Sequence, residues 1–117
     1  MSCPDFIAQS FAVRTAAHLL HLQSTSYAQH VALQGFYDAL VPLIDSYAEV
    51  YQGDNGLIKK YPSKAPPDST PLDLLTDYLD LVREEMEEDE ESEALKNILA
   101  EIEQLTSTSV YKIRFLK

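Results

Sequence analysis

Histidines and carboxylates in the first half of the chain are of the types that form metal sites. His18, His21 and His30 lie in the first third of the chain, and Asp45 and Glu49 follow His30 on the same expected helix. Imidazole nitrogens and carboxylate oxygens together bind iron and other first-row metals. These side chains are therefore candidate ligands of a metal site.

The histidines also have a simpler interpretation, in which no metal is involved. A histidine on a helix is often buried or interfacial and hydrogen-bonded to a main-chain carbonyl. His18 and His21, taken singly, fit that description. Their combination with Asp45 and Glu49 strengthens the metal interpretation without excluding the simpler one, and both stay open on the sequence alone.

Four helical segments must position these residues. Their expected bounds are about 4–24, 27–52, 71–88 and 92–116. Apolar residues recur at three- and four-residue steps in the second segment, and the stripe continues in phase across Pro42, which indicates one bent helix. Ser2 and Thr70 are the expected caps of the first and third helices, and Gly53 the end of the second. No strand-like alternation of useful length is present, so the expected fold is all-α, with residues 1–117 as a single domain.

The connection between the second and third helices is long and punctuated by Pro62, Pro66 and Pro67. A connection of this length can cross the length of a bundle, so that the two helices it joins run parallel. Short links elsewhere imply antiparallel neighbours. We therefore expect a four-helix bundle with a long crossover between helices 2 and 3, which is the ferritin-like connectivity.

One chain cannot bring the expected ligands together. His30 and Asp45 lie fifteen residues apart on one helix, a rise of about 22 Å. Metal ligands must converge within about 2 Å of the ion. Two copies whose second helices pack antiparallel, about a two-fold axis near residue 37, bring His30 of one copy to Asp45 and Glu49 of the other. We therefore expect a homo-oligomer, a dimer at least.

His18, His30, Asp45 and Glu49 follow one another at steps of 12, 15 and 4 residues, and in this spacing they resemble the ferroxidase ligands of the Dps mini-ferritins. The resemblance implies that these four residues are the metal ligands and carry any catalysis, with His21 as a reserve ligand if the first helix is rotated by one turn. A local string resembles the D-x-x-A-E motif of that family: Asp45-Ser46-Tyr47-Ala48-Glu49. The resemblance implies ferrous iron bound between subunits, its oxidation by peroxide or oxygen, and ferric mineral stored inside a dodecameric shell. Tailed phages also encode small ferritin-like proteins of this kind, and the chain resembles those proteins too. Gln34 stands where many Dps proteins carry a further acidic ligand.

Charge narrows the set of partners. Nineteen acidic against nine basic residues give a net charge of −10. Such a surface repels phosphate backbones, so direct nucleic-acid binding is not expected, whereas cations and basic proteins are attracted. The longest uncharged stretch, residues 15–37, contains three His and three Gln and is not a membrane span. No basic start followed by an apolar run is present, so we expect no signal peptide and a cytoplasmic location.

Two classes of function follow from these features. The first is a metal-binding oxidoreductase, which the matched ligand spacing favours. The second is a non-catalytic acidic helical protein that binds a basic protein partner without metal, which Gln34 and the net charge favour. The acidic run Glu84 to Glu93 is expected to be a solvated corner.

Overall fold

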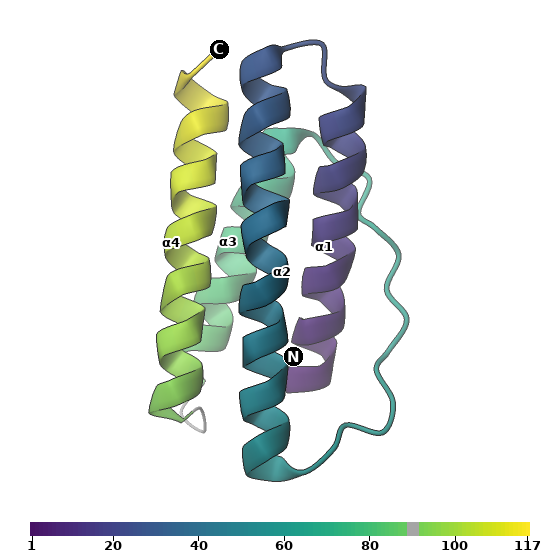
Figure 1. Ribbon diagram of the computed structural model, residues 1–117, viewed down its shortest axis with the longest axis vertical. Coiled ribbons are helices and arrows are strands. Elements are labelled where there is room, and N and C mark those ends of the chain that lie inside the picture. The colour runs from purple at the N-terminus through teal and green to yellow at the C-terminus, as the bar shows by residue number, and fades with distance from the viewer. Residues whose placement is uncertain (89–91) are drawn as a thin grey trace.

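The computed structural model describes residues 1–88 and 92–117, which form four helices and no strand. The helices are α1 (Cys3–Gln23), α2 (Tyr27–Asn55), α3 (Pro71–Met86) and α4 (Glu93–Phe115). They lie side by side in a bundle that measures 44 × 25 × 20 Å (Figure 1). The predicted all-α class and four-helix bundle are confirmed. Within the described ranges, no helix combines the length and the apolar character that a membrane span requires.

A hydroxyl side chain begins each helix. Ser2, Ser26, Thr70 and Ser92 each accept a hydrogen bond from the main-chain N–H three residues further on. The bond satisfies one of the N–H groups that an α-helix leaves unpaired in its first turn. The caps predicted at Ser2 and Thr70 are therefore confirmed.

α2 is longer than the sequence indicated. It continues through Gly53 to Asn55 and ends at Gly56, whose φ is 91°. L side chains rarely adopt a φ in this region, so Gly56 rather than Gly53 is the glycine that ends the helix. Pro42 lies inside this continuous helix with an exposed side chain. Its ring removes a single main-chain donor on the solvent side, and the helix continues past it.

The packing places α1 and α4 each against both α2 and α3. Figure 1 shows α1 and α2 antiparallel, joined by a short link. Residues 56–70 then run along the outer side of α1 to the other end of the bundle, so α3 points in the same direction as α2. An ion pair ties this segment to α1, with Lys64 Nζ 3.7 Å from Asp5 Oδ1. The segment therefore borders the outer face of α1.

Aromatic rings form the centre of the core. Phe6 meets Tyr47 edge-on, with ring centroids 5.4 Å apart, and stacks on Tyr78 at 6.4 Å. The Tyr78 hydroxyl donates to Ser10 Oγ at 2.7 Å, and the Ser10 hydroxyl donates to the Phe6 carbonyl at 2.8 Å. These bonds satisfy polar atoms that burial has removed from water.

Glu85 corrects part of the expectation for the acidic run. The sequence indicated a solvated corner from Glu84 to Glu93, yet Glu85, in the last turn of α3, is only 3 % exposed. Its spacing from the buried residues Tyr78 and Val82 explains this, because residues three, four and seven apart share one face of a helix. Residues 89–91 of the run lie outside the described residues.

Candidate functional site on the outer face of α1 and α2

Two of the predicted histidines meet where α1 ends and α2 begins. The rings of His21 and His30 are stacked, with centroids 3.6 Å apart and an interplanar angle of 20°. His21 Nδ1 lies 2.7 Å from the carbonyl oxygen of His30, and His30 Nδ1 lies 2.8 Å from the carbonyl oxygen of His21. The link 24–26 is short enough to place the last turn of α1 beside the first turn of α2.

The chemistry of these bonds determines which ring nitrogen remains available. A carbonyl oxygen only accepts hydrogen bonds, so Nδ1 of both His21 and His30 must carry the proton. In the neutral ring the lone pair is then on Nε2. Histidines that bind metals commonly donate their second ring N–H to a carbonyl in this way. Within the described residues His30 Nε2 forms no hydrogen bond, so its lone pair is available to a ligand.

His18 and Tyr37 extend the group of stacked rings. The His18 ring lies on Tyr37 with centroids 4.2 Å apart, and Tyr37 also meets His21 edge-on at 5.4 Å. The Arg14 guanidinium lies 5.5 Å from the Tyr37 ring centroid. His21 is buried, whereas His18 and His30 are half-buried. The reserve ligand His21 is therefore the least accessible of the three histidines, and its contacts are those of a structural residue.

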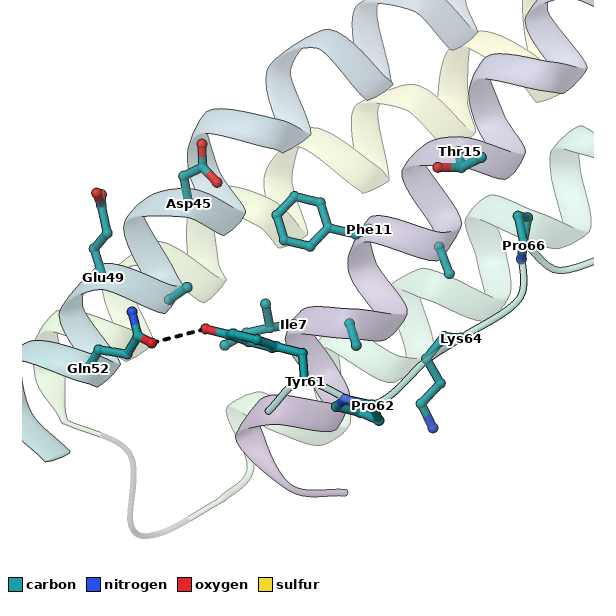
Figure 2. A pocket seen from close by; sticks show the side chains of 13 residues that line it. Ile7, Phe11, Thr15, Asp45, Glu49, Gln52, Tyr61, Pro62, Lys64 and Pro66 are labelled. Carbon is teal, nitrogen blue, oxygen red and sulfur yellow. Dashed lines mark hydrogen bonds between the residues drawn. The ribbon is translucent and has the colours of Figure 1, made fainter. Parts of the chain in front are cut away.

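The two predicted carboxylate ligands lie one turn apart on the outer face of α2. Asp45 and Glu49 are exposed, and neither forms a hydrogen bond or an ion pair within the described part of the chain. Both belong to the lining of a pocket of about 680 Å³. Figure 2 shows the two carboxylates on the α2 side of this pocket. They are therefore free to bind a cation or a donor group from outside the chain.

The other walls of the pocket come from α1 and from the segment that follows α2. α1 contributes mostly apolar side chains, and the Phe11 ring projects between the two helices (Figure 2). The Tyr61 hydroxyl donates to Gln52 Oε1 at 3.3 Å. Partial burial raises the pKa of the Tyr61 phenol. Lys64 lines the side away from the carboxylates and pairs with Asp5. The pocket thus has an apolar floor and a negative rim on one side.

A single chain does not bring the four predicted ligands together. His18 and His30 lie at the end where the two helices are linked, and Asp45 and Glu49 lie toward the other end of α2. In residues 1–88 and 92–117 no three His, Cys, Asp or Glu side chains are grouped closely enough to hold a metal ion. A metal site made of these residues therefore needs a second copy of the chain.

Two features of this face were not predicted from the sequence. Tyr61 and Lys64 line the pocket, although the segment between α2 and α3 was expected to act only as a connection. An aromatic residue beside Pro62 was the available signal, because residues before proline favour extended backbone that can lie along a helix. The central position of Tyr37 among the histidines was also missed, because its place in the apolar stripe of the second helix does not show which side chains of α1 it contacts.

The fold and this face define a small four-helix bundle with an open polar and apolar surface on one helix pair. Residues 21–113 match a family described as Family of unknown function (DUF5856). The match covers well over half of the chain, so the protein belongs to that family. It includes His30, Asp45 and Glu49 and leaves His18 outside. Comparisons with curated proteins and with solved structures give no match.

Proposed function

We propose that this protein is a ferritin-like, Dps-type protein that binds and oxidises ferrous iron at sites shared by two copies of the chain. In each site, His18 and His30 of one copy meet Asp45 and Glu49 of the other. The observation that carries the proposal is the state of the carboxylates, which are exposed and have no partner in the described part of the chain. The path of the chain supports it, because α2 and α3 point the same way, as in ferritin-like bundles.

The available donors fit iron. Imidazole nitrogen and carboxylate oxygen are both ligands of this metal. The Nδ1–H of His30 is held by the carbonyl of His21, which orients the ring and keeps Nε2 as the ligand atom. Gln34 is exposed and offers a neutral amide oxygen where Dps proteins carry an acid. The site therefore has one negative charge fewer than theirs.

The carboxylates give the site its preference for the oxidised ion. Each ferrous ion gives one electron to dioxygen or peroxide, and the product carries one more positive charge. Asp45 and Glu49 attract a trivalent cation more strongly than a divalent one, because Coulomb attraction grows with the charge. A closed shell built from such dimers would retain the ferric product as mineral.

The proposal is tested by adding ferrous iron without oxygen, measuring bound metal, and then following oxidation by absorbance after oxygen is admitted. His30→Asn is the sharpest variant, because the asparagine amide keeps an N–H donor near the position of Nδ1 and removes Nε2. Asp45→Asn removes a charge. We expect each to lower bound iron and oxidation at least about tenfold, with unchanged helicity. Asp54→Asn, the same change at another exposed position of α2, is the control. A wild-type protein with no bound metal and no oxidation contradicts the proposal.

The exposed acidic surface supports a second candidate function, a metal-free module that binds a basic protein surface. Apart from the pairs Lys64–Asp5 and Arg83–Glu103, most acidic side chains in the described ranges face solvent. Long-range attraction of this kind is screened by salt. Binding of a lysine-rich peptide in EDTA that disappears at high salt and is unaffected by His30→Asn would favour this function.

A further inference from the structure

We infer that the pocket beside Asp45 and Glu49 is filled by a second copy of this chain, through an apolar tip at the linked ends of α1 and α2. The apolar tip consists of Leu19, Leu22, Tyr27 and Val31. The inference rests on the two-fold pairing in the proposed function. It names the surface that holds the two copies together independently of metal.

The apolar tip has the properties of a contact surface. Residues 15–37 contain no Asp, Glu, Lys or Arg, although the whole protein has a net charge of −10. Tyr27 is 82 % exposed and Leu22 is 67 % exposed. Large apolar side chains gathered at exposed positions are typical of a surface that another protein covers.

The apolar tip and the pocket lie on the same side of α2, toward its opposite ends. Tyr27 and Asp45 are 18 residues apart, as are Val31 and Glu49. Eighteen residues make five full turns and a rise of about 27 Å, so these side chains point in the same direction. The tip of one copy therefore reaches the pocket of the other if the two α2 helices run antiparallel.

One axis position satisfies both the apolar and the polar contacts. Residue 38 is the midpoint between Tyr27 and Glu49 and also between Val31 and Asp45. The midpoint between His30 and Asp45 falls beside it, between residues 37 and 38. A two-fold axis at this level places the tip of each copy over the pocket of its partner, and it repeats every contact twice.

The chemistry of the two surfaces is complementary. The pocket has an apolar floor in which Phe11 is 38 % exposed, and the tip supplies one aromatic and three aliphatic side chains. The Tyr27 hydroxyl is a donor for the carboxylates on the rim, which have no partner within the described part of the chain. In the proposed pairing, the histidines beside the tip of one copy face the carboxylates of the other copy. A second copy thus matches both the apolar and the charged parts of the pocket.

Thiol crosslinking in EDTA tests this register without any contribution from metal. The single cysteine is first removed by Cys3→Ser. Tyr27→Cys and Glu49→Cys proteins are then treated with a short bis-maleimide, separately and mixed, at a concentration well above the dissociation constant of the Tyr27→Ser dimer, because Tyr27→Cys also removes the aromatic ring. Two-fold pairing places residue 27 of one copy against residue 49 of the other, whereas the two copies of residue 27 stand about 33 Å apart. We expect a covalent dimer from the mixture and none from either variant alone. A covalent dimer from Tyr27→Cys alone, or none from the mixture, overturns the inference.

A second measurement tests the apolar tip itself. Tyr27→Ser is expected to raise the dissociation constant of the metal-free dimer at least about tenfold, because a buried aromatic anchor is lost. Tyr111→Ser, the same change at an exposed position of α4, should leave it unchanged. A dimer that Tyr27→Ser does not weaken overturns the inference.

The two proposals can fail separately. If the mixed variants crosslink but the wild-type protein binds no iron, the docking surface is supported and the iron site is contradicted. Iron binding that needs His30 and Asp45, without any crosslink between residues 27 and 49, supports the iron site and overturns the docking surface.

Discussion

His21 and His30 are each hydrogen-bonded through the ring to the main chain of the other. The Nδ1–H of each ring donates to the other residue's carbonyl oxygen, at 2.7 and 2.8 Å, and the rings stack at 3.6 Å. This exchange joins the last turn of α1 to the first turn of α2. His30 therefore stabilises the helix pair in addition to its proposed part in metal binding, and the two contributions must be separated by experiment.

Loss of the His21 ring should destabilise the protein even without metal. His21→Leu places an apolar side chain at this buried position, and it removes one hydrogen bond and the ring stack. We expect a loss of about 1–3 kcal/mol in the free energy of unfolding, from the bond and the ring contact together. Urea denaturation in EDTA measures it. Gln23→Leu, at an exposed position of the same helix, is the control; equal stability of both variants would show that the exchange of hydrogen bonds contributes nothing.

The two glycines near the end of α2 should respond to alanine in opposite ways. Neither has an atom within 4 Å of the added Cβ, so the main-chain conformation decides the effect. Gly53 is helical, and Gly53→Ala should stabilise the protein by about 0.5–1 kcal/mol. Gly56 has a φ of 91°, and Gly56→Ala should destabilise it by about 1 kcal/mol. Thermal unfolding of both variants beside the wild type measures the difference. If both variants change the melting temperature in the same direction, the assignment of Gly56 as the end of α2 is contradicted.

Tyr78 should make the stability fall at alkaline pH. Burial raises the pKa of its phenol above the ordinary value of 10.0, against a smaller opposite effect of the hydrogen bond to Ser10. Above about pH 10 the unfolded chain releases this proton and the folded chain keeps it, so unfolding becomes more favourable as the pH rises.

The variant Tyr78→Phe separates this effect from other alkaline changes. It should cost about 1 kcal/mol at neutral pH, through the lost hydrogen bond. It should also reduce the fall in stability above pH 10 by up to about 1.4 kcal/mol per pH unit. Urea denaturation at several pH values measures both quantities. Tyr111→Phe, on the surface of α4, should change neither; an unaltered alkaline slope in Tyr78→Phe would argue against the buried phenol as its source.

The proposed axis predicts an effect at Asp38. This residue is exposed on α2, and the two-fold pairing brings the two copies of it together at the axis. Because like charges in contact repel, Asp38→Asn should tighten the dimer, by up to about fivefold for 1 kcal/mol of relieved repulsion. Sedimentation in EDTA at low salt measures the change, and added salt should reduce it. Asp80→Asn, exposed on α3, is the control. A weaker dimer in Asp38→Asn would place the axis elsewhere.

The elements of the fold were largely predictable because their signals are local. Ser2 and Thr70 begin helices because a hydroxyl can accept from an N–H three residues away, and the apolar steps of α2 follow from the period of a helix. The same period predicted that Asp45, Glu49 and His30 lie on one side of α2. Whether they meet between copies is a property of an assembly, and the ligand set remains a prediction.

The sequence by itself determined the four helices, the caps at Ser2 and Thr70 and the acidic surface, since each depends on residues within one or two turns. The tertiary structure alone decided that Glu85 is buried, that Gly56 ends α2, and that Tyr61 lies against the α1–α2 pair. The reciprocal hydrogen bonds between His21 and His30 were also decided by the tertiary structure. These features depend on which surfaces of separate segments come together, and the packing of the whole chain selects among arrangements that the local sequence leaves equally available.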